Sequence, residues 1–175
     1  MNCIVLYSSR TGNTEKIAKE ICSVLPNETP CLSVADAPEN LDAYDCVFVG
    51  FWVDRGTADA QSKKLLERLH HPKVALFATL GADPDSEHAT SSMQNAIALL
   101  PSNAMPIHTF ICQGKVDPNL IEQMKKMFPT GHPHAVTSER EKLHERASVH
   151  PDDRDLQAAR NFVVETLKRL ENSAL

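Results

Sequence analysis

This chain of 175 residues lacks the sequence signatures of several common protein classes. Neither GxGxxG nor GxxxxGK(S/T) occurs, which excludes the dinucleotide-binding fingerprint and the loop that grips nucleoside triphosphates. No apolar run approaches the ~20 residues that a membrane-spanning helix needs. Basic residues form no cluster and the formal net charge is −5 at pH 7, so we expect neither nucleic acid nor a membrane among its partners.

The number and spacing of the cysteines also argue against a zinc site. There are five of them, with no CxxC pair, at Cys3, Cys22, Cys31, Cys46 and Cys112. They lie in or beside apolar runs, which predicts buried, reduced thiols and no zinc site. Because Met1 leads directly into an apolar run without a signal-peptide pattern, we expect a cytoplasmic protein.

Apolar runs and helix-periodic segments alternate along the chain. Composition is that of a globular protein, with 42% hydrophobic and 23% charged residues. The predicted strands are 3–8, 31–35, 46–51, 73–79 and 107–112. The predicted helices are 14–25, 59–69, 89–100, 117–128 and 152–171, with a further short one at 138–146. This alternation predicts one α/β domain over residues 1–175, with a parallel sheet covered by helices on both faces.

A small, hydroxyl-rich turn follows the first predicted strand. It reads Ser9-Arg10-Thr11-Gly12-Asn13-Thr14, and a helix pattern begins near its end. The start of a helix has unpaired backbone N–H groups and partial positive charge, so it attracts an anion. The turn therefore predicts a phosphate site, against the alternative of an ordinary capped turn without a ligand.

The same six residues carry a family resemblance. They match the S/T-x-T-G-x-T loop with which flavodoxins hold the 5′-phosphate of flavin mononucleotide (FMN), and the chain resembles that family. The resemblance implies a flavodoxin-like three-layer sandwich with a five-stranded parallel sheet in the order 2-1-3-4-5. The ligand crevice would then lie between strands 1 and 3, at their carboxyl ends.

Two further loops would contact FMN if the resemblance holds. After the third strand, flavodoxins place an aromatic ring against the flavin, and Trp52 is the only tryptophan here; a loop anchor is the other interpretation. The loop after the fourth strand has no second aromatic, a departure that would leave one flavin face open. The cofactor-binding residues we expect are Ser9, Arg10, Thr11, Gly12, Asn13, Thr14, Phe51, Trp52, Val53, Asp54, Gly56, Thr57, Thr79, Leu80, Gly81 and Ala82.

One polar stretch does not belong to the minimal fold. Residues 129–151 hold half of the eight histidines, namely His132, His134, His144 and His150. A metal site is conceivable because imidazole is a common ligand, but the spacing matches no ligand pattern. We expect a polar insertion before the last helix, with no metal.

The resemblance implies an FMN-binding electron-transfer protein that passes electrons from a flavin or ferredoxin-type reductase to an acceptor enzyme. The alternative is an FMN-dependent oxidoreductase that acts directly on a quinone- or tetrapyrrole-like substrate. A third possibility is a flavin-free interaction domain. We expect a monomer or weak dimer, and no catalytic side chain stands out.

Two other classes with this architecture are excluded by their missing residues. Gly50-Phe51 supplies no acid where a receiver domain needs one, and Cys3 and Arg10 are spaced wrongly for a tyrosine phosphatase loop.

Overall fold

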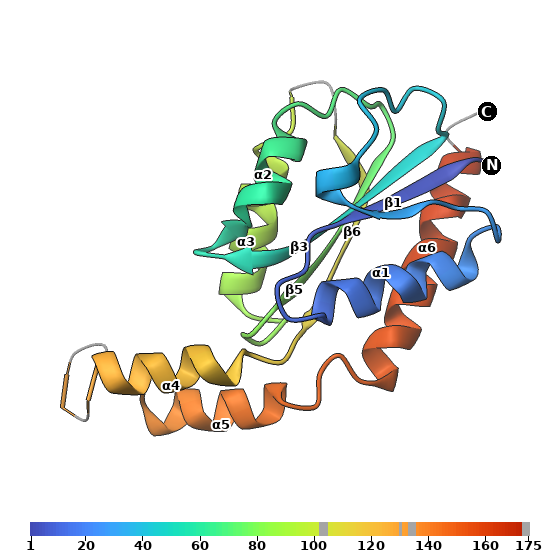
Figure 1. The fold of residues 1–175 in the computed structure, drawn as a ribbon. Coiled ribbons are helices and arrows are strands. Elements are labelled where there is room, and N and C mark those ends of the chain that lie inside the picture. Colours follow the sequence, from blue (N-terminus) through green and yellow to red (C-terminus); the bar gives the residue numbers. More distant parts are fainter. Residues whose placement is uncertain (102–104, 130, 133–135, 173–175) are drawn as a thin grey trace.

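A five-stranded parallel sheet forms the centre of the protein in a computed structural model (Figure 1). The structure describes residues 1–101, 105–129, 131–132 and 136–172. The strands are β1 (Cys3–Tyr7), β2 (Cys31–Ser33), β3 (Cys46–Asp54), β5 (Val74–Leu80) and β6 (Pro106–Gln113). Their order, β2-β1-β3-β5-β6, is the order predicted from the sequence.

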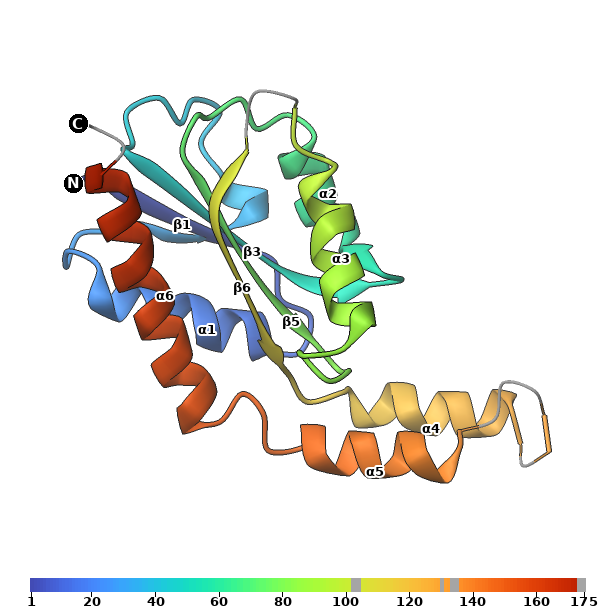
Figure 2. The ribbon, with the colours of Figure 1, turned by 180° about the vertical axis from the view of Figure 1, so that it is seen from behind.

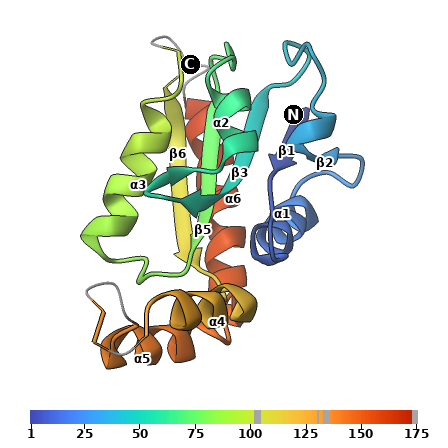
Figure 3. The same cartoon turned by 60° about the vertical axis from the view of Figure 1, so that its left-hand side comes forward.

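Helices cover both faces of the sheet. They are α1 (Asn13–Val24), α2 (Ala60–Leu66), α3 (Glu87–Ile97), α4 (Pro118–Met127), α5 (Ser138–Ala147) and α6 (Asp153–Asn172), with a 3₁₀ turn η1 (Val34–Asp36) after β2. On one face lie α1 and α6, which Figure 2 shows side by side, and an ion pair between Arg160 and Glu20 joins them. On the other face lie α2 and α3 (Figure 3). The predicted three-layer sandwich is therefore confirmed.

Burial follows from the sequence pattern of each element. The run Cys3-Ile4-Val5-Leu6 of β1 is 0–1% exposed because both faces of a central parallel strand are covered. In α1, the buried side chains Ile17 and Ala18 precede the buried Ile21 by four and three residues, as one face of a helix requires. Phe162 of α6 packs edge-on to Phe48 of β3, with ring centroids 6.0 Å apart.

The strand β3 is longer than the sequence predicted. The sequence predicts that this strand ends at residue 51, but β3 continues to Asp54 and pairs antiparallel with the short strand β4 (Thr57–Ala58). Arg55 and Gly56 form the two-residue turn, with φ of 50° and 77°. Positive φ at both positions is what a tight hairpin with right-handed twist requires. The loop expected after the third strand is thus a β-hairpin.

The segment after β6 leaves the three layers. In Figure 3, α4 and α5 lie together beneath the carboxyl end of β6, away from both faces of the sheet. No residue of α4 is buried, and only Ala147 of α5 is. The backbone N–H of Lys115 donates to the carbonyl of His150 at 2.9 Å. We call residues 116–149 the helical hairpin; its two ends meet at this bond.

The polar stretch predicted at 129–151 overlaps the second half of this helical hairpin. Its predicted short helix is α5. Of its histidines, His134 lies outside the described residues. His150 shares a hydrogen bond of 2.5 Å with Asp155 in the first turn of α6, so it stabilises the start of that helix. In the described ranges no helix is both long and apolar enough to cross a membrane.

Candidate functional site

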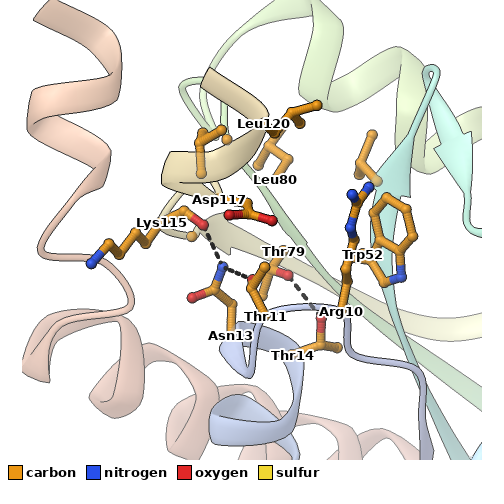
Figure 4. Close-up of a pocket in the computed structure, with 14 residues that line it drawn as sticks. Arg10, Thr11, Asn13, Thr14, Trp52, Thr79, Leu80, Lys115, Asp117 and Leu120 are labelled. Carbon is orange, nitrogen blue, oxygen red and sulfur yellow. Dashed lines mark hydrogen bonds between the residues drawn. The ribbon is translucent and has the colours of Figure 1, made fainter. Parts of the chain in front are cut away.

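A cavity of about 210 Å³ opens at the carboxyl edge of the sheet (Figure 4). It lies where the chain reverses direction across the sheet, between the strands β1 and β3, which is where open α/β sheets bind ligands. Four segments supply its walls: the β1–α1 turn, the end of β3, the end of β5 and the residues after β6. The lining residues are Arg10, Thr11, Asn13, Thr14, Trp52, Val53, Thr79, Leu80, Gly81, Gly114, Lys115, Val116, Asp117 and Leu120.

The β1–α1 turn presents free hydrogen-bond donors to this cavity. Gly12 is the N-cap of α1, and no side chain caps this helix. By contrast, α2, α3, α4 and α5 each have an N-cap residue whose side chain accepts a hydrogen bond from a backbone N–H of its helix; these N-caps are Asp59, Ser86, Asp117 and Thr137. The first N–H groups of α1 are therefore left for a ligand, and the helix dipole favours an anion there.

The hydroxyl groups of the turn are held in place by its neighbours. The Thr14 side chain is 1% exposed and shares a hydrogen bond of 2.9 Å with the Thr79 hydroxyl of β5. The Asn13 amide donates to the Thr11 hydroxyl at 3.1 Å and to the Lys115 carbonyl at 2.8 Å. Gly12, with φ of 89°, adopts a left-handed conformation that favours glycine. The donors are thus arranged before any ligand arrives.

Trp52 supplies the aromatic wall. It is half-buried near the end of β3, and its carbonyl accepts the Asp59 backbone N–H at 3.2 Å. The Arg10 guanidinium lies 5.6 Å from the centroid of the Trp52 ring, a cation–π contact. Figure 4 shows Arg10 between this ring and the middle of the cavity. A planar ligand that stacks on Trp52 from the cavity must displace the exposed Arg10 side chain.

The segment after β6 forms a wall that the sequence did not predict. Gly114, Lys115, Val116, Asp117 and Leu120 line the cavity. This wall is packed closely against the others, because a Cβ at Gly114 would lie only 2.8 Å from the Asn13 amide nitrogen. A Cβ at Gly81 would overlap the side chain of Val116. The start of the helical hairpin is therefore part of the cavity itself.

Nine of the predicted cofactor-binding residues lie together in this cavity: Arg10, Thr11, Asn13, Thr14, Trp52, Val53, Thr79, Leu80 and Gly81. The others, Ser9, Gly12, Phe51, Asp54, Gly56, Thr57 and Ala82, are not among its lining residues, and their roles stay predictions. Phe51 is 0% exposed in the core. Gly56 lies at the β3–β4 turn, where its carbonyl accepts the Asn95 amide of α3 at 2.9 Å. The residues after β6 contain no sequence motif that predicts a ligand site. Only their position at the end of a predicted strand could have indicated that they line the cavity.

The sheet order and the uncapped start of α1 together form a site suited to an anionic group, at the topological switch point of an α/β sheet. The model for the flavodoxin domain matches residues 4–164, and the chain belongs to the flavodoxin family. The family and fold predicted from the sequence are thereby confirmed.

The chain is similar to other proteins along most of its length. It is 34% identical over 165 residues to the flavodoxin-like domain-containing protein BilS of Clostridioides difficile (strain CD3), covering 93% of this chain and 94% of the relative. Solved structures that share the fold include two flavodoxins. One is a short-chain flavodoxin associated with a non-canonical PDU bacterial microcompartment. Its TM-score is 0.63 at 12% identity, and the match covers 97% of this chain and 99% of that flavodoxin. The other is a Fusobacterium nucleatum flavodoxin bound to flavin mononucleotide. Its TM-score is 0.57 at 13% identity, and the match covers 96% of this chain and 98% of that flavodoxin.

Proposed function

We propose that this protein binds FMN in the cavity and carries electrons from a reductase to a partner redox enzyme. The observation that carries the proposal is the uncapped start of α1, which faces the cavity that Trp52 also lines. The family assignment supports FMN as the cofactor. When bound, FMN supplies the ability to accept and donate electrons one or two at a time, and the protein supplies position and electrostatics.

The residues present fit this cofactor. The backbone N–H groups at the start of α1, with the hydroxyls of Thr11 and Thr14, would hold the phosphate. Trp52 would lie against the ring system once Arg10 moves aside. The cavity of about 210 Å³ is smaller than the roughly 300–1,000 Å³ usual for small-molecule sites. Arg10 lines this cavity and is exposed, so moving its side chain aside would leave more space for the ligand.

The proposed location is a reducing cytoplasm. The five free cysteines support it, because an oxidising compartment would favour their pairing.

The test of electron transfer is a reduction assay on the FMN-loaded protein under anaerobic conditions. We expect NADPH or NADH alone to reduce the flavin slowly, and a catalytic amount of a ferredoxin-type or flavin reductase to accelerate reduction at least tenfold. The absorbance of the flavin reports the reaction. Rapid reduction by NADPH alone, with turnover on an added quinone, would contradict the carrier role.

A second candidate function is that of an FMN-dependent oxidoreductase acting on its own substrate. The observation that favours it is the wall opposite the phosphate turn, where aliphatic Leu80, Val116 and Leu120 line the cavity and the loop after β5 has no aromatic residue. A flavin face bordered by small aliphatic groups leaves room for a flat substrate. Steady-state turnover of a quinone or tetrapyrrole without any added reductase distinguishes this function from the first.

Replacing Trp52 with alanine is expected to weaken FMN binding by about 1–2 kcal/mol, the scale of an aromatic contact, or roughly 5–30-fold. The bound flavin should also become more fluorescent, because a stacked indole quenches it. Fluorescence titration of the apoprotein measures both. Trp52→Phe is the matched control, since it keeps a ring on the same wall and should retain most of the affinity. Equal affinity in Trp52→Ala and the parent would leave Trp52 as a loop anchor.

A further inference from the structure

Asp59, the N-cap of α2, is a buried acid whose two carboxylate oxygens differ. The side chain is 2% exposed. Its Oδ1 accepts hydrogen bonds from the Ser8 hydroxyl at 2.9 Å and from the backbone N–H groups of Gln61 and Ser62 at 3.0 and 3.2 Å. Its Oδ2 is also buried and has no hydrogen-bond partner among the described residues. A buried carboxylate oxygen without a donor is costly, and capping does not require it, since a serine and a threonine cap α3 and α5.

The bond from Ser8 to Asp59 is one of two buried hydrogen bonds that flank the β1–α1 turn. Ser8 lies directly before the turn and is 6% exposed. At the other end of the turn, the Thr14 hydroxyl is bonded to the Thr79 hydroxyl, and these two residues are 1% and 2% exposed. Between them, residues 10–12 are exposed. The exposed part of the turn is therefore anchored on both sides by buried side chains.

Asp59 also contacts the backbone of the aromatic wall. The last main-chain bond between the end of β1 and β3 is donated by the Ser8 N–H to the Gly50 carbonyl at 2.9 Å. Beyond it β1 has ended, while β3 continues through Trp52. The Asp59 N–H donates to the Trp52 carbonyl at 3.2 Å, and the Asp59 carboxylate receives the Ser8 hydroxyl. One residue thus joins the start of the β1–α1 turn to the strand that carries Trp52.

We propose that Asp59 is the positioning residue of the FMN site, which holds the β1–α1 turn at a fixed place relative to Trp52 before the cofactor binds. The inference rests on the proposed binding of FMN. Asp59 is not among the residues that line the cavity, so it acts through Ser8 and not by touching the ligand. A turn that is fixed in advance binds a phosphate without first losing conformational freedom.

The test compares FMN with riboflavin, which has the same ring system and ribityl chain but no phosphate. In Asp59→Ala, we expect the ratio of FMN affinity to riboflavin affinity to fall roughly tenfold or more, because the turn must then be ordered on binding. A general loss of stability would weaken both ligands by the same factor and leave the ratio unchanged. Fluorescence titration of the apoproteins, well below the Tm of each variant, measures the ratio. An unchanged ratio in Asp59→Ala would overturn the proposal.

Two further variants separate the anchor from the helix cap. Ser8→Ala removes the hydrogen bond to Asp59 but keeps the cap of α2, and it should lower the ratio as Asp59→Ala does. Asp59→Asn keeps an oxygen that can accept from Ser8 and from the α2 backbone, and its ratio should stay within about threefold of the parent. A parent-like ratio in Ser8→Ala would assign the effect to the cap of α2 and overturn the proposal. A ratio in Asp59→Asn as low as in Asp59→Ala would do the same, since charge and not the hydrogen bond would then matter.

The emission of Trp52, the only tryptophan, tests the anchor without any flavin. Arg10 of the β1–α1 turn lies 5.6 Å from the centroid of its ring, so the emission of the apoprotein depends on where the turn lies. We expect Ser8→Ala to shift this emission toward that of Arg10→Ala, and Asp59→Asn to match the parent. An emission in Ser8→Ala equal to that of the parent, when Arg10→Ala differs, would contradict the anchor. A parent that binds riboflavin as tightly as FMN would instead contradict the proposed function, and the emission would still decide whether Asp59 positions the turn.

Discussion

Replacing Thr11 and Thr14 together with alanine is expected to weaken FMN binding by two orders of magnitude or more. A hydroxyl that donates to a charged phosphate contributes roughly 1.5–3 kcal/mol, and both hydroxyls lie at the uncapped start of α1. The neighbouring partners of these groups, Asn13 and Thr79, already hold them toward the cavity. Fluorescence titration of the apoprotein with FMN measures the loss.

The control for this double variant is Thr90→Ala, which removes a threonine hydroxyl from the exposed surface of α3. It should leave FMN affinity unchanged. Because Thr14→Ala also leaves the Thr79 hydroxyl without its partner, thermal unfolding of the apoproteins separates lost stability from lost binding. If the double variant binds FMN as tightly as the parent, the proposal that the FMN phosphate binds at the start of α1 is wrong.

Replacing Gly50 with alanine is expected to destabilise the fold by about 3 kcal/mol, at the upper end of overpacking effects in a core. Gly50 of β3 is the register partner of Phe77 on β5. A Cβ at Gly50 would overlap the ring of Phe77, which is 0% exposed and has no room to retreat. For a chain of this size the loss lowers Tm by roughly 6–12 °C, which calorimetry or circular dichroism measures.

The second-site variant Phe77→Leu gives this prediction its control. The single change Phe77→Leu should destabilise the protein by itself because it removes buried apolar surface. In the Gly50→Ala background it should cost much less, or partly restore Tm, because the smaller side chain makes room for the new methyl group. Strictly additive effects of the two substitutions would show that the Gly50 methyl and the Phe77 ring do not compete for space.

The sheet was predictable because its strands have strong local patterns. The runs at 3–8, 46–51 and 73–79 are continuous and rich in β-branched or aromatic residues, and the structure places strands at each of them. The β3–β4 hairpin was missed because its turn has no Asn-Gly or Gly-Gly pair. Arg55 adopts a φ of 50°, which few residues other than glycine do.

The part of the site formed by the β1–α1 turn was predictable from the sequence, and the wall formed by the residues after β6 was not. The β1–α1 turn has a short motif of hydroxyl residues and glycine before a helix, and this motif predicts a phosphate ligand. The wall after β6 has no pattern of this kind, because Val116 and Leu120 reach the cavity only through the tertiary position of α4. The contact between Arg10 and Trp52 was equally hidden, since 42 residues separate them in the sequence.

The helical hairpin, residues 116–149, should open and close on its own timescale. Its helices bury almost no side chains, and its ends are joined by the bond from Lys115 to His150. Its backbone amides should therefore exchange with deuterium through local opening, well before those of β1 or β5. Since Val116 and Leu120 also line the cavity, a ligand that contacts them binds the closed form better. Linkage then requires that filling the cavity slows hydrogen exchange along α4, so that exchange in this helix reports occupancy of the cavity.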